Sequence, residues 1–204
     1  MNRETLEWYS NKADEFLRST SNADMTRMYE RFLHFMPEPV RDEDDRVKIM
    51  DLGCGSGMAS LYFKRNGYNV VPIDGCKEMC EATEKRTGLV VRELVFQDLD
   101  YTEEFDGIWA CASLLDVPMD EMEHVLSLVN RALKDGGTAY ASFKYGDGER
   151  EKGGRRFTDF TEVSLEKMLD KVEKLQILDL WCTEDVREAR SGERWVNVVW
   201  RKVG

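Results

Sequence analysis

Residues 49–57 have the sequence IMDLGCGSG, an apolar strand-like run followed by three glycines at every second position. Glycine allows the backbone to turn sharply and to bring its N–H groups against a ligand without a side-chain clash. From about Met58 onward, the apolar residues recur at helical spacing. A strand, a glycine turn and a helix in this order predict the start of a nucleotide-binding α/β sheet.

Helical and strand-like periods alternate along the rest of the chain. Helices are predicted over residues 4–17, 23–36, 58–66, 77–86, 119–134 and 163–172, with Gly136 and Gly137 ending the fifth. Strands are predicted over residues 47–52, 69–73, 89–96, 105–110, 138–143, 175–181 and 195–201. This order predicts an α/β fold, with a doubly wound, mostly parallel seven-stranded sheet and helices on both faces. No helix separates the last two strands, which should therefore form an antiparallel C-terminal hairpin.

The length and charge of the chain limit its organisation and its partners. A length of 204 residues fits one domain, with residues 1–45 as an N-terminal helical lid of two helices and 46–204 as the α/β core. Lys and Arg total 29 against 40 Asp and Glu, a net charge of -11. Binding a phosphate backbone needs a surplus of cations, so we expect no nucleic-acid partner.

The sequence also predicts where the protein resides and what it does not bind. No run approaches the roughly 18 apolar residues of a membrane span, and the first residues lack the apolar part of a secretory signal. We therefore expect a cytoplasmic protein without a membrane partner. The five cysteines are scattered and odd in number, and the two histidines lie far apart, so neither disulfides nor a metal site is expected.

The glycine turn differs from two common nucleotide-binding motifs. A dinucleotide fingerprint has the form GxGxxG, but the third glycine comes one residue early, at Gly57. A phosphate-binding P-loop would end in Lys followed by Ser or Thr, which is absent here. Both differences weaken the hypotheses of NAD binding and nucleotide triphosphate binding.

Three aspartates follow successive strands and suggest another ligand. Asp51 directly precedes the glycines, where a carboxylate suits a cationic amino group better than a pyrophosphate. Asp74 ends the next strand and can accept hydrogen bonds from both hydroxyls of a ribose. Asp98 follows the third strand and can accept a hydrogen bond from an adenine amine. Together they predict a site for a nucleoside that carries an amino acid.

The motifs DLGCGSG, Asp74, QDL, FDGIWACASLL and LKDGG occur in the order found in one large family. From about Val47 to its C-terminus, the chain resembles the Rossmann-like, class I S-adenosylmethionine-dependent methyltransferases. The resemblance implies that S-adenosyl-L-methionine is the cofactor and that the reaction is methylation by a transferase. The cofactor-binding residues that it implies are Asp51, Gly53, Cys54, Gly55, Gly57, Asp74, Gly75, Met79, Gln97, Asp98, Leu99, Ala110, Cys111 and Ala112.

The resemblance assigns a role to each part of this set. Asp51 and the glycines would hold the methionine part, Asp74 the ribose, and Asp98 with Leu99 the adenine. Residues 110–112 would lie beside the sulfonium. Each aspartate also has a purely structural interpretation, Asp74 as a turn residue and Asp98 as a helix cap, and Cys111 could be a core thiol.

A narrower resemblance concerns the segments YSNKADEF, ADMTRMYERFL, WACASLLDVP, FKYGDGER and RRFTDFTE. They look like a bacterial subgroup of small-molecule-type methyltransferases of unassigned substrate. Members of that subgroup tend to have a histidine where this chain has Asp116, so a histidine base cannot be carried over. Asp116 could still accept a proton or bind a cation, or it could only cap a helix or belong to a loop.

The acceptor site is predicted from the parts of the chain that can reach the C-terminal ends of the strands. Asp116 and Tyr9 are the candidate catalytic residues. The candidate substrate-binding residues are Tyr29, Lys144, Tyr145, Arg155 and Arg156. The basic residues belong to a glycine-rich loop, 144–157, which could clamp a carboxylate or phosphate of an anionic acceptor or could simply be a solvated loop. Tyr9 and Tyr29 have an alternative interpretation as packing residues on the faces of their helices.

The sequence therefore predicts a cytoplasmic S-adenosylmethionine-dependent methyltransferase that acts on a small molecule. Two other functions stay open: methylation of a protein or an RNA, and binding of the cofactor by a non-catalytic regulatory module. The methylated atom, the use of a general base and the number of subunits are open as well. Gly146, Gly148, Gly153 and Gly154 should make the 144–157 loop flexible, so that it and the N-terminal helices gate the acceptor site.

Overall fold

The computed structural model of the protein describes residues 3–39 and 46–204. Its centre is a seven-stranded sheet in the order β3-β2-β1-β4-β5-β9-β8. The strands are β1 (Lys48–Leu52), β2 (Asn69–Asp74), β3 (Arg92–Glu93), β4 (Phe105–Ala110), β5 (Leu133–Lys144), β8 (Leu175–Glu184) and β9 (Arg194–Lys202). Strands β3, β2, β1, β4 and β5 are parallel, and β9 is antiparallel to both of its neighbours. The predicted fold, with its C-terminal hairpin at the sheet edge, is confirmed.

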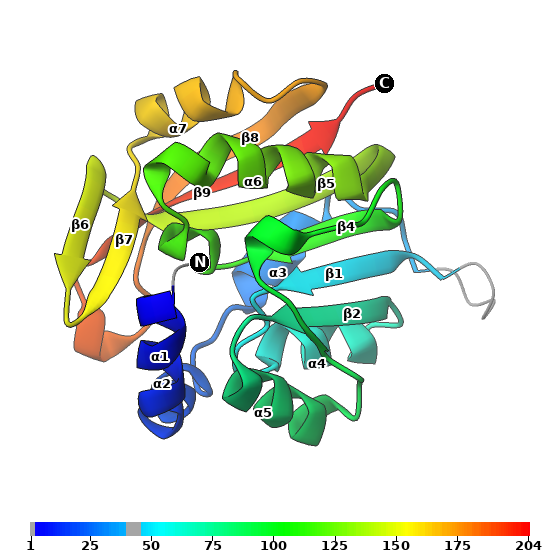
Figure 1. Cartoon of the computed structure of the whole chain (residues 1–204). Coiled ribbons are helices and arrows are strands. Elements are labelled where there is room, and N and C mark those ends of the chain that lie inside the picture. Colours follow the sequence, from blue (N-terminus) through cyan, green and yellow to red (C-terminus); the bar gives the residue numbers. More distant parts are fainter. Residues whose placement is uncertain (1–2, 40–45) are drawn as a thin grey trace.

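Helices lie on both faces of this sheet (Figure 1). The helices are α1 (Arg3–Asn11), α2 (Ala13–Thr20), α3 (Thr26–Leu33), α4 (Met58–Arg65), α5 (Lys77–Thr87), α6 (Met119–Ala132) and α7 (Glu162–Leu169). Short 3-10 turns are η2 (Phe96–Asp98), η3 (Leu114–Asp116) and η4 (Glu188–Arg190). No helix of the described ranges is both long and apolar enough to cross a membrane.

The pleat of the strands divides the core into two layers, because successive side chains of a strand point to opposite faces. Ile49 of β1 packs in one cluster with Phe32 of α3 and Phe63 of α4. Its neighbour Met50 packs in the other cluster, which contains the apolar faces of α6 and α7. The first layer also holds Trp109, whose ring stacks on that of Tyr140 at 4.1 Å. Residues at odd positions of β1, Asp51 among them, therefore face the α3 and α4 side.

Two predicted boundaries near the N-terminal half are wrong. The helix predicted over residues 4–17 is interrupted at Lys12, so α1 and α2 are separate, and the described residues before the sheet contain α1, α2 and α3 instead of two helices. The break lets the rings of Tyr9 and Phe16 meet edge to face at 5.2 Å. The strand predicted over 89–96 has only two paired residues. Arg92 and Glu93 pair with Ile73 and Asp74, the last two residues of β2. The predicted division between lid and core, at residue 45, lies outside the described residues.

The glycine pair at residues 136 and 137 does not end a helix, as the sequence suggested. Helix α6 ends at Ala132, and β5 begins at the next residue. A Cβ on Gly137 would lie 2.9 Å from the carbonyl oxygen of Lys134, so glycine is required for this tight path. Pairing with β4, which shifts register between Phe105 and Gly107, replaces the expected helix cap.

The segment 144–157 is not a loop but mostly a hairpin. Strands β6 (Gly148–Lys152) and β7 (Arg155–Asp159) pair antiparallel as a separate two-stranded sheet. Gly153 and Gly154 connect them with positive φ angles of 62° and 79°. Positive φ at both central residues is the requirement of a type I′ hairpin turn, which a Gly-Gly pair satisfies. The prediction of a flexible glycine-rich loop is therefore corrected to a paired hairpin.

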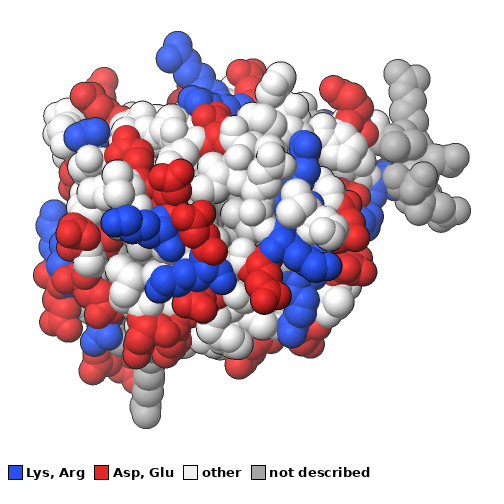
Figure 2. Space-filling model, turned by 90° about the horizontal axis from the view of Figure 1, so that it is seen from above, with Lys and Arg blue, Asp and Glu red and all other residues white. Residues whose placement is uncertain are grey.

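The surface matches the composition of the chain. The face seen in Figure 2 mixes Lys and Arg side chains with those of Asp and Glu. Several pairs form ion pairs at the surface, such as Arg92 with Asp100 at 2.8 Å. Exposed pairs of this kind contribute little to stability, so the two core layers and the sheet carry most of it.

Candidate functional site

A cavity of about 230 Å³ lies at the carboxyl edge of the parallel strands. Its walls come from the glycine turn, the N-terminal helices, the ends of β4 and β5, and the connection from β8 to β9. Ligands of open α/β sheets bind at this edge, so the cavity is the candidate functional site. The sequence-predicted residues that line it are Tyr9, Tyr29, Asp51, Gly53, Cys54, Gly55, Asp74, Met79, Cys111, Ala112 and Asp116.

The glycine turn brings bare backbone against the cavity. Gly53 has a φ of +81°, and a Cβ built on it would lie 2.4 Å from the Cβ of Ser113. Its N–H and that of Cys54 both donate to the carbonyl of Ile73, at 2.8 and 2.9 Å, which ties the turn to β2. A side chain at Gly53 would therefore strain the backbone and push Ser113 away.

Asp51 is a buried carboxylate with a single hydrogen-bonding side chain beside it. It is 2% exposed, and the hydroxyl of Ser60 donates to its Oδ2 at 2.5 Å. Burial raises the pKa of Asp51 to about 7, although the bond from Ser60 acts in the opposite direction. A cation placed in the cavity would restore the ionised form, so this position suits a positively charged group.

Asp74 ends β2 and lies 8% exposed at the same end of the cavity. The backbone N–H groups of Gly55 and Cys76 each donate to one of its carboxylate oxygens at 2.9 Å. Burial raises the pKa of Asp74 to about 6, against the lowering effect of these two bonds. Each oxygen keeps a further lone pair that can accept a hydroxyl from a ligand.

The end of β4 is held in an unusual backbone conformation. Ala112 has a φ of 52°, a left-handed value that is costly for a residue with a Cβ. Its N–H donates to the Ser142 hydroxyl at 2.9 Å, and that hydroxyl donates to the Cys111 thiol at 3.6 Å. Burial raises the pKa of Cys111 to about 11, so its thiol is neutral at neutral pH.

Tyr9, Asp116 and Arg155 form a polar cluster beside the cavity. The Tyr9 hydroxyl donates to Oδ2 of Asp116 at 2.8 Å, and Nη2 of Arg155 lies 2.9 Å from both carboxylate oxygens. The same Arg155 nitrogen also contacts the Tyr9 hydroxyl. Burial raises the pKa of Asp116, whereas the charge of Arg155 lowers it. The carboxylate of Asp116 is therefore paired, and Arg155 faces it instead of lining the cavity.

The N-terminal helices and the β6–β7 hairpin contact one another. The indole N–H of Trp8 donates to the carbonyl of Gly153 at 2.8 Å, and the Arg155 guanidinium lies 4.8 Å from the Trp8 ring. Farther along, a Cβ on Gly55 would lie 3.6 Å from the ring of Phe16, so α2 covers the glycine turn. The two segments predicted to cover the acceptor site thus contact one another, but only the N-terminal helices line the cavity, and none of residues 144–157 does.

The other predicted site residues lie outside the cavity lining. Gly57 caps α4, Ala110 is fully buried, and Gln97 donates to Glu121 at 2.6 Å. Asp98 is exposed, and nearby Phe96 lines the cavity instead.

The remaining predicted residues outside the cavity lining are Gly75, Leu99, Lys144, Tyr145, Arg155 and Arg156. Lys144 binds Asp185 and Glu193, Tyr145 packs under Arg194, and Arg156 lies 3.8 Å from Glu149.

Sequence reasoning missed one whole wall of the cavity. The residues from the end of β8 and the start of β9 that line it are Thr183, Glu184, Asp185, Val186, Arg187, Trp195 and Asn197. The sequence pattern predicts only a polar connection between these two strands. A signal was available, because two antiparallel steps from β5 make β8 parallel to β5 and so bring their carboxyl ends to the same edge.

The comparison with protein families agrees with this geometry. Residues 50–141 match the family model described as a methyltransferase domain. The match covers 92 residues, which is less than half of the chain. The match runs from β1 into β5 and thus contains the glycine turn, Asp51 and Asp74. The predicted family resemblance is confirmed for this part of the chain.

Curated relatives of the methyltransferase domain are distant. An uncharacterized methyltransferase of Synechocystis is 30% identical over 92 residues, which are 44% of this chain and 43% of that protein. The cypemycin N-terminal methyltransferase of a Streptomyces species is 28% identical over 101 residues, which are 47% of this chain and 41% of that protein. The chain thus matches less than half the length of these curated relatives.

A solved structure resembles the chain over almost its full length. The 1,6-didemethyltoxoflavin-N1-methyltransferase of Burkholderia thailandensis superposes with a TM-score of 0.79 at 19% identity. The match covers 98% of this chain and 88% of that one. The N-terminal helices and the C-terminal hairpin therefore share its fold along with the methyltransferase domain.

Proposed function

We propose that the protein transfers a methyl group from S-adenosylmethionine to a small-molecule acceptor. The observation that carries the proposal is the pair of buried carboxylates, Asp51 and Asp74, on either side of the glycine turn. S-adenosylmethionine has an ammonium group and a ribose diol, which match a carboxylate of raised pKa and a second carboxylate with free lone pairs. The toxoflavin methyltransferase of the same fold was solved with S-adenosylhomocysteine bound, which supports this cofactor.

The residues around the glycine turn fit each part of the cofactor. Asp51 would bind the ammonium group, and the bare backbone of Gly53 and Gly55 would approach the methionine part. Asp74 would accept the two ribose hydroxyls. Apolar Met79 and Phe96 line the same end of the cavity and suit the adenine ring. The hydrogen bond from adenine to exposed Asp98 stays a prediction.

The chain's own contribution to the reaction would be positioning. The bound sulfonium supplies an activated methyl group, and transfer needs the nucleophile, methyl and sulfur in line. The rigid backbone at Ala112 would fix the wall beside the sulfur, and the neutral Cys111 thiol would not compete as a nucleophile. The pairing of Asp116 with Tyr9 and Arg155 favours a role in holding α1 over the cavity instead of proton transfer.

A small acceptor fits the enclosure of the site. The cavity of about 230 Å³ lies under α1, α2 and the start of α3, which leave little room for a polymer at the methyl group. The 1,6-didemethyltoxoflavin-N1-methyltransferase of the same fold was solved with 1,6-didemethyltoxoflavin bound, which supports a small-molecule acceptor. Methylation of a protein or RNA would require the N-terminal helices to move away.

Calorimetry with S-adenosylhomocysteine tests the proposal. We expect one binding site per chain, and a 10- to 100-fold weaker affinity for Asp74→Ala, since hydrogen bonds to a charged group contribute about 1.5–3 kcal/mol. Asp147→Asn is the matched control, because Asp147 is exposed and is not among the residues that line the cavity. No binding by the native protein, or tighter binding of NADH, would contradict the cofactor assignment. Label transfer from the methylated cofactor to a metabolite extract, against none with the cofactor alone, tests catalysis.

A further inference from the structure

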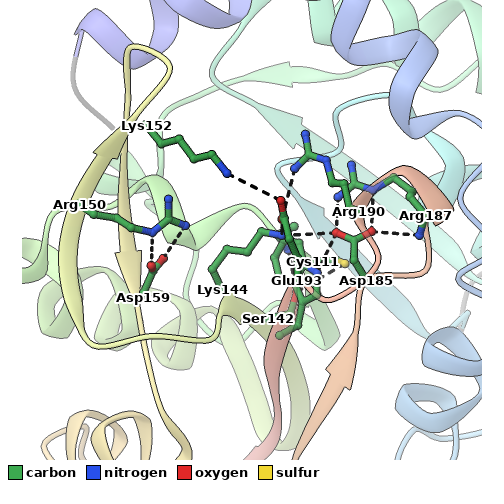
Figure 3. A network of polar contacts seen from close by, with 12 residues as sticks. Cys111, Ser142, Lys144, Arg150, Lys152, Asp159, Asp185, Arg187, Arg190 and Glu193 are labelled. Carbon is green, nitrogen blue, oxygen red and sulfur yellow. Dashed lines mark hydrogen bonds and ion pairs between the residues drawn. The ribbon is translucent and has the colours of Figure 1, made fainter.

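The wall formed by β8 and β9 holds a cluster of charged residues around Asp185 (Figure 3). Asp185 has a side chain that is 2% exposed and comes directly after β8. Its Oδ1 accepts hydrogen bonds from the backbone N–H and the Nε of Arg187, at 3.0 and 2.8 Å. Its Oδ2 accepts from Nη2 of Arg187 at 2.6 Å, from the Trp195 indole at 3.1 Å and from Lys144 at 3.4 Å. The carboxylate is saturated with donors.

This saturation fixes the charges of the wall. Burial raises the pKa of Asp185, but the bonds from Arg187 and Trp195 outweigh it and lower the pKa below the usual range. The bond to Asp185 in turn raises the pKa of Arg187. Both groups are therefore ionised at every physiological pH, and Asp185 has no lone pair left for a ligand.

Arg187, in contrast, keeps part of its donor capacity. A guanidinium has five N–H donors, and the bonds to Asp185 use one on Nε and one on Nη2. The other donors have no hydrogen-bond partner among residues 3–39 and 46–204, yet Arg187 lines the cavity with a side chain that is 21% exposed. It is the one basic residue in the described lining. A cavity that holds four aspartates thus presents one cation with unused donors.

The surroundings of Arg187 are positively charged as well. Lys144 and Arg190 contact Glu193, as does Lys152, so four cations surround the two carboxylates Asp185 and Glu193 (Figure 3). This excess contrasts with the net charge of -11 of the whole chain. Glu184 directly precedes Asp185 and also lines the cavity. It is exposed, and its side chain has no hydrogen bond or ion pair in the described structure.

Arg187 also lies close to the predicted position of methyl transfer. Its charge acts on the nearby Cys111, whose thiol borders the cavity at the end of β4. The cavity lining also contains the aromatic and apolar residues Trp195, Tyr140 and Met28, along with the uncharged polar residues Ser142, Thr183 and Asn197. A ligand near Arg187 would meet one cationic fork, apolar rings and a few uncharged polar groups.

We propose that Arg187 binds an oxyanion of the methyl acceptor, and that the acceptor is a compact, mainly apolar molecule carrying a carboxylate or another delocalised oxyanion. The proposal rests on the function proposed above. It moves the expected anion site from Arg155 and Arg156, which are paired with Asp116 and Glu149, to the β8–β9 wall. Asp185 positions the guanidinium, and Lys144 and Trp195 hold Asp185 in place.

Benzoate and benzamide test the proposal as probes of equal shape and different charge. Saturation-transfer NMR would measure their binding to the native protein saturated with S-adenosylhomocysteine. We expect benzoate to bind at least tenfold more tightly than benzamide. Arg187→Gln should remove this difference, whereas Arg65→Gln, at an exposed position on α4, should preserve it. Equal binding of the two probes to the native protein, or an unchanged preference in Arg187→Gln, would overturn the proposal.

Calorimetry on the same variants separates this proposal from the cofactor assignment. S-adenosylhomocysteine affinity should stay within threefold in Arg187→Gln, because the amino acid part of the cofactor, with its ammonium and its carboxylate, would lie at Asp51 and the glycine turn and not at Arg187. If the native protein bound no S-adenosylhomocysteine, the proposed function would fail first. If Arg187→Gln lost the cofactor through local collapse, Arg187→Lys replaces it, because lysine keeps the positive charge but not the planar fork of donors. Arg187→Lys should retain the cofactor and show a weaker preference for benzoate than the native protein, and a preference equal to the native one would overturn the role of the guanidinium.

Discussion

The two ends of the cavity use the same residue type in opposite ways. At the glycine turn, Asp51 is buried with one side-chain donor, and burial raises its pKa to about 7. At the β8–β9 wall, Asp185 is a half-buried residue that accepts bonds from Arg187, Trp195 and Lys144. The bonds from Arg187 and Trp195 hold the pKa of Asp185 below the usual range. Burial and the number of donors together decide which carboxylate still needs a cation.

This difference has a functional consequence. The under-paired Asp51 suits a cationic ligand, whereas the saturated Asp185 leaves Arg187 with spare donors for an anionic one. A sulfonium cofactor and an oxyanion acceptor would then approach each other from opposite ends of one cavity. Charge segregation of this kind would orient both ligands before the methyl group moves.

The largest expected effect contrasts glycines at the two ends. Gly53→Ala should destabilise the protein by about 2–5 kcal/mol, because a left-handed residue with a Cβ adds strain to the overlap with Ser113. Gly192→Ala, in the β8–β9 connection, has a φ of +87° but nothing within 4 Å of the new Cβ. It should cost only about 1–2 kcal/mol. Urea unfolding of both variants measures the difference, and equal losses would show that the Ser113 contact is unimportant.

The next largest expected effect is a pH dependence of ligand binding, which should occur at the glycine turn and not at the β8–β9 wall. S-adenosylhomocysteine affinity should fall roughly tenfold from pH 8 to pH 6, because protonation of Asp51 near pH 7 competes with the ligand's ammonium. Asp51→Asn should bind more weakly and lose most of this dependence. Asp185 stays ionised over this range, so the preference for benzoate over benzamide should not change with pH. Calorimetry and NMR at pH 6, 7 and 8 provide both comparisons, and a pH-independent native affinity would place the ammonium elsewhere.

The same raised pKa predicts the sign of a stability change in the ligand-free protein. A carboxylate whose pKa is raised on folding contributes stability that is complete below the unfolded pKa of about 4 and is lost as the pH rises through the folded value. For Asp51 this window extends from about pH 4 to about pH 7. Over that window, the native protein should lose stability relative to Asp51→Asn.

The smallest expected effect is on stability and concerns the contact between Tyr9 of α1 and Asp116 of η3. Tyr9→Phe removes the hydroxyl that donates to Asp116 and should destabilise the protein by about 1 kcal/mol. Tyr62→Phe is the control, since Tyr62 stacks on Tyr29 and its hydroxyl makes no hydrogen bond within the described structure. Urea unfolding should distinguish the two variants. Equal stabilities would mean that Arg155 alone holds Asp116.

The sequence located one end of the cavity and overlooked the other for a physical reason. Asp51, Gly53 and Gly55 lie within five residues, and Asp74 ends the next strand along the chain, so a local pattern contains them. Arg187 and Trp195 are brought to Cys111 only by the pairing of β9 with β5 and β8 with β9. The segment between these strands, residues 185–194, is mostly polar and carries no recognisable motif.

The roles expected near the cover changed for a similar reason. A lone Asp116 suggested a base and a basic 144–157 segment suggested an anion clamp, because each was considered without its partner. In the structure, Asp116 and Arg155 face one another across η3 and β7, with Tyr9 of α1 between them. Two charges that looked available are each other's partners.

The α/β order of elements, the glycine turn and the carboxylates near the ends of β1 and β2 could all be predicted from the sequence. Those features depend on local periodicity and on backbone conformations that only glycine adopts readily. The tertiary structure decided which charges remain unpaired, because an ion pair depends on strand order and helix docking between residues far apart in the chain. Arg155 is paired with a residue 39 positions away. Arg187 is paired locally with Asp185, and the pairing of β9 with β5 and β8 is what brings it into the cavity lining.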